Sequence, residues 1–290
     1  FFSSRRRHTR FRNVTGVQTC ALPISRCLLA GTSLRHGGPW WSLAGFPGPE
    51  PAGEAFVNLL KLEHDIEQMS YLLDRRLLSP DFHRVMAEYE LLRGEMIASY
   101  GRQPIVKLRR GLFHLFDDTY QRMLRWRETP RLPGGALGTG WDRHEVEARY
   151  AVPPGICWID GLLSPEALSA LSAFALESTS WSDIAHNFMG GETSRGYLGA
   201  YSGDGLCAPL LFQIAEDLGR ALPGIFRDRP LTQMWAYKYA SSLEGIDVHG
   251  DDAAVNVNFW ITPDEANLDP DSGGLVVHPI EAPADWPFDE

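Results

Sequence analysis

The sequence predicts an α+β fold, in which a helical region precedes a β-rich domain. Between residues 56 and 92, apolar side chains recur every three or four positions, as they do on one face of an amphipathic helix. Between residues 253 and 262 they alternate with polar side chains, which is the period of a strand with one buried face. The pattern changes near residue 150. We therefore expect a helical region at 54–130 and a strand-containing domain at 150–290.

No element is expected in residues 1–53. Residues 1–26 contain six arginines and no acidic residue, and their segments SSRRRHTR and VTGVQTCALPIS closely resemble translated sequencing-adapter DNA. An organellar transit peptide has a similar composition, but this stretch lacks a sustained helical period. We therefore expect residues 1–26 to be an artefact, foreign to the native protein. Residues 27–53 are rich in Gly, Pro and Trp without any period, which predicts an irregular linker.

Three helices are expected in the helical region. The second begins at Ser79-Pro80-Asp81, since Ser is a favoured N-cap and Pro suits the first helical position, and it ends at Gly101. The third covers 109–127. His64 and Asp65 are expected on the solvated face of the first helix, whose buried stripe is Phe56, Leu59, Leu62, Ile66, Met69 and Leu73. The helices are either the end of a helical-repeat array or an extension packed on the next domain.

The β-rich domain is predicted to contain strands and two helices. A short strand is expected at 157–160, a helix capped by Ser164, another helix at 205–221, and strands at 231–240 and 253–262. In the last strand Val255, Val257, Phe259 and Ile261 share the core face, and Asn256, Asn258 and Trp260 share the other. That second face suits a wet pocket. For the two asparagines, solvent-exposed edge positions are the alternative.

The composition excludes some classes of function. The formal net charge is −10, and without residues 1–26 the chain has 21 basic and 37 acidic residues. A protein with this excess of acidic residues is not expected to bind nucleic acid through contacts to the phosphates. No apolar run is long enough to span a bilayer, so no membrane role is expected. The four cysteines form no CxxC pair, which predicts reduced thiols and a cytoplasmic protein, while the oligomeric state stays open.

The motif that indicates chemistry is His249-Gly250-Asp251, between the last two predicted strands. In extended backbone, residues two apart point to the same side, so an imidazole and a carboxylate can reach one metal ion. These are two of the three ligands of a 2-His-1-carboxylate site, which binds iron(II) and leaves positions open for oxygen and a co-substrate. The triplet alone is a common chance occurrence, so the residues around it decide its interpretation.

The order of residues around this motif resembles the iron(II)- and 2-oxoglutarate-dependent dioxygenases, in particular the prolyl-hydroxylase-like group. The resemblance covers roughly 150–290. It implies an incomplete double-stranded β-helix, or jelly roll, with flanking helices. It rests on a Tyr-containing strand, a Gly-containing turn, H-x-D, a strand that ends in an aromatic residue, an acidic loop and an S-G-G-L segment: Tyr239, Gly245, His249, Asp251, Trp260, 263–271 and 272–277.

The resemblance implies roles for six residues. His249 and Asp251 match the first two iron ligands. Tyr239 stands where the family commonly has a tyrosine that contacts 2-oxoglutarate, and Trp260 matches an aromatic residue of the same pocket, with Asn256 and Asn258 beside it. The implied cofactors are iron(II) and 2-oxoglutarate as co-substrate, and the implied substrate is a protein side chain or a small molecule. For Trp260, a core aromatic is the alternative.

Two functional residues of the family are not found. Its distal His ligand and the basic residue that binds the far carboxylate of 2-oxoglutarate lie on later strands, but no Arg or Lys follows Lys238. His278 is too close to Asp251 to be the third ligand. We therefore expect a C-terminally truncated fragment that is inactive. The alternatives are a non-enzymatic helical-repeat interaction protein with a degenerate jelly roll, and a cupin-like domain that binds zinc or manganese.

Overall fold

The computed structural model describes residues 13–19, 54–102, 105–109, 111–182, 197–202, 205–239, 253–263 and 277. The chain divides into two compact units. The first, here called the sheet unit, comprises Phe1–Ala21, Thr129–Ser172 and Ala208–Glu290. The second, the helical unit, comprises Leu22–Glu128 and Ala173–Cys207. The units are thus discontinuous, and the helical unit includes residues that we had grouped with the β-rich domain.

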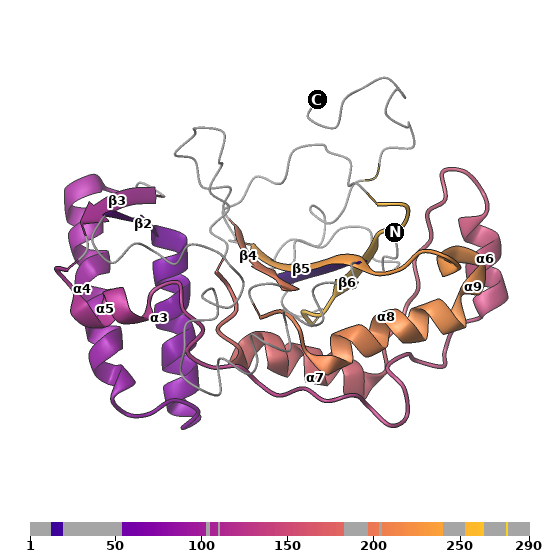
Figure 1. Cartoon of the computed structure of the whole chain (residues 1–290), viewed down its shortest axis with the longest axis horizontal. Coiled ribbons are helices and arrows are strands. Elements are labelled where there is room, and N and C mark those ends of the chain that lie inside the picture. The colour runs from indigo at the N-terminus through magenta and orange to yellow at the C-terminus, as the bar shows by residue number, and fades with distance from the viewer. Residues whose placement is uncertain are drawn as a thin grey trace, which may run out of the picture. The chain divides into compact units, whose positions relative to one another are not determined.

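The helical unit is built on two packed helices, α3 (Leu59–Asp74) and α4 (Phe82–Tyr100) (Figure 1). Strands β2 (Glu54–Asn58) and β3 (Ile105–Arg109) pair antiparallel. The unit also contains the short helix α5 (His114–Thr119) and strand β4 (Tyr197–Tyr201). Its core is apolar and aromatic, and includes Val57, Leu62, Ile66, Met69, Tyr89, Leu92, Met96, Phe116 and Tyr120.

The second predicted helix is confirmed, and the first begins later than expected. α4 begins at Phe82 with Asp81 as its N-cap, so the predicted cap at Ser79 is two residues too early. Ser79 Oγ accepts a hydrogen bond from the N–H of Asp81 in the turn that leads into the helix. Gly101 ends α4 with φ of 65°, and its N–H bonds to the carbonyl of Ile97. The first helix starts at Leu59, because Asn58 caps it through a bond from the N–H of Lys61. Phe56 lies in β2 and is 42% exposed.

The third predicted helix, over 109–127, is wrong. Residues up to Arg109 form β3, and the helix α5 is only six residues long. The carboxylate of Glu88 on α4 accepts hydrogen bonds from the N–H groups of Leu115 and Phe116, which have no partner within the first turn of α5. After Thr119 the backbone becomes extended at Tyr120, whose aromatic ring is buried in the core. Tertiary packing therefore overrides the local helical pattern.

The sheet unit combines helices with an antiparallel sheet. Its helices are α6 (Arg143–Tyr150), α8 (Pro209–Ala221) and α9 (Pro223–Phe226), and α7 (Pro165–Glu177) begins in it. Ser164 caps α7 as predicted, because its Oγ accepts from the N–H of Ala167. Helix α8 runs alongside the sheet in Figure 1. The residues expected to form a strand at 157–160 are not a strand, so that prediction is wrong.

The sheet contains, from this unit, β5 (Thr232–Tyr239), β1 (Asn13–Thr19) and β6 (Val257–Trp260) in that spatial order. β1 pairs antiparallel with both neighbours. β5 confirms the strand predicted at 231–240, and β6 confirms only residues 257–260 of the strand predicted at 253–262. β1 lies in a segment for which no element was expected. Mixed helices and strands confirm the α+β class, but within the described ranges the strands close no barrel.

Two further observations concern burial and membranes. Cys157 and Cys207 are free thiols and are buried, and burial raises the pKa of Cys157. Among the helices that the structure describes, none combines the length and the apolar character that a bilayer crossing requires.

Candidate functional site

The register of the sheet separates two faces of β5 and β6. Residues directly opposite each other in paired strands point to the same side. Val17 is the partner of both Met234 and Val257, and Thr15 is the partner of both Ala236 and Phe259. All four of these β5 and β6 residues are buried: Met234 3%, Ala236 4%, Val257 4% and Phe259 6% exposed. This is the core face of the sheet.

The opposite face is aromatic and polar. Gly16 is the partner of both Trp235 and Asn258, and Val14 is the partner of both Tyr237 and Trp260. Tyr239 is two residues beyond Tyr237 on β5, so it points to the same side. We call these five residues the aromatic–amide face: Trp235, Tyr237, Tyr239, Asn258 and Trp260. All are half-buried.

The structure thus brings three predicted site residues, Tyr239, Asn258 and Trp260, to one side of one sheet. Asn256 precedes β6 and is also half-buried. His249 and Asp251, the predicted metal ligands, lie outside the described residues, and so does His278. In sequence the two ligands fall in the connection between the end of β5 and the start of β6.

Two residues of the aromatic–amide face were not predicted. Trp235 and Tyr237 alternate with Tyr239 along β5, and neighbouring ring centroids are 6.4 and 6.1 Å apart. The run W-A-Y-K-Y already contained the signal, because aromatic residues at every second position of a strand must share one side. The sequence predicts the strand at 231–240, but its residues are not divided there between two faces.

The chemistry of the aromatic–amide face suits an organic ligand better than a metal. Tyrosine hydroxyls, an asparagine amide and indole N–H groups can donate hydrogen bonds to a carboxylate, and the rings can exclude water from it. Within the part of the chain that the structure describes, no group of three or more His, Cys, Asp or Glu side chains could hold a metal ion.

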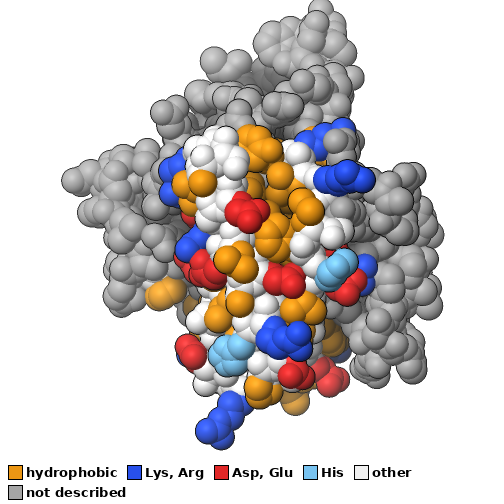
Figure 2. Space-filling model, turned by 90° about the vertical axis from the view of Figure 1, so that its left-hand side faces the viewer, with side chains coloured by type: hydrophobic (Ala, Val, Ile, Leu, Met, Phe, Trp, Pro, Cys, Tyr) orange, Lys and Arg blue, Asp and Glu red, His pale blue; other side chains and the backbone are white. Residues whose placement is uncertain are grey.

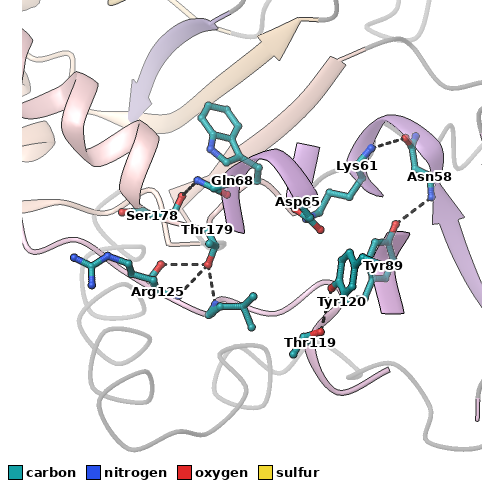
Figure 3. Close-up of polar contacts among 12 residues, drawn as sticks. Asn58, Lys61, Asp65, Gln68, Tyr89, Thr119, Tyr120, Arg125, Ser178 and Thr179 are labelled. Carbon is teal, nitrogen blue, oxygen red and sulfur yellow. Dashed lines mark hydrogen bonds and ion pairs between the residues drawn. The ribbon is translucent and has the colours of Figure 1, made fainter. Parts of the chain in front are cut away.

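A second polar cluster lies in the helical unit, on α3 (Figure 3). Lys61 is 5% exposed, and its ammonium contacts the Asp65 carboxylate oxygens at 2.5 and 2.6 Å. Gln68 donates to the carbonyl oxygens of Leu176 and Ser178, both at 3.1 Å. Lys61 and Asp65 neutralise each other's charge, and the amide of Gln68 is hydrogen-bonded to backbone, so we interpret the cluster as structural.

The expectation that His64 and Asp65 form a solvated face is therefore wrong. His64 is 6% exposed, and its ring meets that of Trp181 edge-on at 6.1 Å between centroids. The side chain of Asp65 is 14% exposed. The physical reason is that Leu176, Ser178 and Trp181, more than 100 positions away in sequence, contact Gln68 and His64 on α3.

Two buried tyrosines adjoin the same cluster. The hydroxyl of Tyr120 accepts from the N–H of Asn58 at 3.0 Å, and that of Tyr89 lies 3.1 Å from the hydroxyl of Thr119 (Figure 3). Burial raises the pKa of both phenols above the ordinary value of 10.0. The Lys61 ammonium is 5.7 Å from the centre of the Tyr120 ring, so this region combines charge and aromatic packing.

The helical unit also has a small hollow of about 180 Å³. Its lining is mainly apolar, with Glu95, Arg109 and Asp117 at polar positions, and includes Val57, Leu92, Met96, Leu108, Leu112, Phe113 and Phe116. Figure 2 shows hydrophobic side chains interspersed with charged ones on one face of this unit. None of the residues predicted as a functional site from the sequence lines the hollow.

Comparison with known proteins adds no relative: no family model, no curated protein and no solved structure matches this chain.

Proposed function

We propose that this chain is part of an iron(II)- and 2-oxoglutarate-dependent dioxygenase that hydroxylates a protein side chain or a small molecule. The observation that carries the proposal is the shared side of Tyr239, Asn258 and Trp260 on two strands that are connected, in sequence, through His249-Gly250-Asp251. A chance H-x-D triplet has no reason to be flanked by strands that turn aromatic and amide side chains to one side of a sheet.

Each residue has a role in this proposal. His249 and Asp251 supply an imidazole nitrogen and a carboxylate oxygen, a donor set that suits iron(II). Tyr239 and Asn258 donate hydrogen bonds to the co-substrate, and Trp260 excludes water beside it. When bound, iron(II) would supply the oxidative chemistry that decarboxylates 2-oxoglutarate and hydroxylates the substrate. The protein residues would bind the metal, orient the co-substrate and exclude water from it.

The first test measures metal binding to the chain. Co(II) replaces oxygen-sensitive Fe(II), and quenching of tryptophan fluorescence reports binding, because Trp235 and Trp260 belong to the aromatic–amide face. His249→Ala and Asp251→Ala should each weaken Co(II) binding at least about tenfold, since each removes one of only two protein ligands. His278→Ala is the matched control and should leave binding unchanged.

The outcomes separate the proposal from its rivals. Equal loss with His278→Ala, or no loss with His249→Ala and Asp251→Ala, would contradict the proposed ligand set and favour a non-enzymatic interaction protein. Zn(II) or Mn(II) binding at the same two residues, without any effect of 2-oxoglutarate, would favour a cupin-like domain.

A further inference from the structure

The hollow in the helical unit has an apolar floor that is reached from the surface. Val57, Met96 and Phe116, which line it, are 0%, 2% and 4% exposed and belong to the core of the unit. Two other lining residues are open to solvent, since Leu112 is 72% and Tyr100 46% exposed. A small molecule in solution can therefore enter the hollow and contact side chains of the core.

The size of the hollow limits what it can hold. Its volume is about 180 Å³. A cavity of roughly 150 Å³ holds one benzene ring, whereas sites for drug-sized ligands begin at roughly 300 Å³. The hollow therefore accepts one aromatic ring or one branched alkyl group, with the rest of the ligand at its rim.

Opposite charges line the same hollow. Glu95 on α4 and Arg109 on β3 are both exposed lining residues. Among the residues that the structure describes, their side chains form no ion pair with each other and no hydrogen bond with a third group. The third charged lining residue differs, because the Asp117 carboxylate accepts a hydrogen bond from the N–H of Gly111 at 2.6 Å. One cation and one anion are thus available to a ligand.

We propose that this hollow binds a monomeric α-amino acid with an aromatic or branched apolar side chain. The side chain of the ligand occupies the apolar floor. Its α-carboxylate pairs with the guanidinium of Arg109, and its α-ammonium pairs with the carboxylate of Glu95, both through charge-assisted hydrogen bonds. A ligand with a carboxylate alone would leave Glu95 without a partner. The proposal does not rest on the oxygenase activity proposed above.

The first test is equilibrium dialysis of the full chain against radiolabelled L-phenylalanine, which carries one ring and both charges. Binding should be saturable. Arg109→Gln and Glu95→Gln should each weaken it about tenfold, because each removes one charge-assisted hydrogen bond. Arg84→Gln is the matched control, at an exposed residue of α4 outside the hollow, and should leave binding unchanged.

A steric pair of variants tests the location of the site. Ser99→Trp adds a bulky ring at an exposed lining position of α4, so it should abolish binding while leaving the core intact. Ala98→Trp adds the same ring at the neighbouring exposed position, which does not line the hollow, and should bind as the unaltered chain does. Unchanged binding in Ser99→Trp would overturn the proposed location.

Analogues with one charge test the class of ligand. Phenylacetate lacks the ammonium and 2-phenylethylamine lacks the carboxylate, so each should bind at least about tenfold more weakly than L-phenylalanine. Equal binding of the three compounds, or unchanged binding in both Arg109→Gln and Glu95→Gln, would overturn the assignment of an amino acid. Absence of saturable binding at millimolar L-phenylalanine, where a ligand of this size should bind, would overturn the site itself.

Discussion

The phenol of Tyr120 joins three features of the helical unit. Its hydroxyl accepts from the N–H of Asn58, the residue whose side chain caps α3, and its ring stacks on Phe116 with centroids 4.6 Å apart. Tyr120 is 2% exposed. Water therefore cannot replace the hydroxyl as an acceptor, and an ionised phenolate at this position would be poorly solvated.

The first prediction concerns Tyr120→Phe and alkaline pH. Below pH 10 the variant should lose about 1–3 kcal/mol of unfolding free energy, because the N–H of Asn58 loses a buried acceptor. Burial raises the pKa of Tyr89 and Tyr120 in the folded state. Their stabilisation is therefore fully present below the unfolded value of about 10 and is lost as pH rises toward the folded pKa.

Urea unfolding between pH 8 and 11.5 measures both effects. Above pH 10 each buried phenol should contribute a loss of up to about 1.4 kcal/mol per pH unit, and Tyr120→Phe should remove one such contribution from the slope. Tyr100→Phe, at a residue that is 46% exposed, controls for the loss of a hydroxyl. An unchanged slope in Tyr120→Phe would mean that Tyr120 ionises freely in the folded chain.

At single residues, sequence succeeded where the decisive interaction is with a near neighbour. Asn258 and Trp260 could be assigned to one face because a strand alternates strictly. His64 could not be placed, because its burial comes from Trp181, 117 positions away. Charged neighbours on α3 suggest a solvent-exposed face, whereas Lys61 and Asp65 neutralise each other in a largely buried ion pair.

Among the elements, a short bridge in the sheet unit depends on one glycine. The N–H of Gly138 bonds to the carbonyl of Leu162 at 2.8 Å, and the N–H of Ser164 bonds to the carbonyl of Ala136 at 2.9 Å. Ser164 also caps α7, so this bridge fixes where that helix begins. A Cβ on Gly138 would lie 2.1 Å from the carbonyl oxygen of Gly161.

The second prediction is that Gly138→Ala destabilises the sheet unit by about 1–3 kcal/mol. The obstructing atom is a backbone oxygen, so no side-chain rotation can relieve the contact. Gly140→Ala is the matched control, because a Cβ there meets nothing within 4 Å. Urea unfolding followed by circular dichroism compares the two variants. Equal stability of both would show that the 136–138 and 162–164 segments separate easily.

The same scale shows which elements local sequence can specify. The end of α4 and the start of α7 follow from Gly101 and Ser164, because caps act within one turn, whereas α4 begins two residues later than a cap at Ser79 predicts, with Asp81 as its N-cap. The third helix failed because Glu88 and the aromatic core determine residues 109–127 from outside the segment. β1 could not be predicted either, since its partners lie more than 200 residues away.

At the scale of the whole molecule, each compact unit is assembled from separated stretches of chain. The helical unit includes residues 173–182, whose polar groups form hydrogen bonds with Gln68 on α3 and with the backbone after α5. Periodicity along the sequence cannot reveal such a division, because it reports only on neighbours. We had expected the boundary to follow the change of pattern near residue 150, and residues 173–207 instead belong with the helices.

The third prediction tests this discontinuity through Thr179. Its hydroxyl accepts from the N–H groups of Leu124 and Arg125 at 2.7 and 3.0 Å, and it donates to the carbonyl of Arg125 at 3.2 Å (Figure 3). Thr179→Val keeps the shape but removes the hydroxyl, so two backbone donors lose their acceptor. The unfolding free energy of the helical unit should fall by about 1–3 kcal/mol.

Thr179→Ser is the matched control, because it retains the hydroxyl and should recover most of that loss. Urea unfolding followed by circular dichroism measures the stability of both variants. Amide exchange at Leu124 and Arg125 should accelerate in Thr179→Val and remain slow in Thr179→Ser. If neither variant changes exchange there, residues 173–182 are dispensable for the helical unit, and its fold is complete within 54–128.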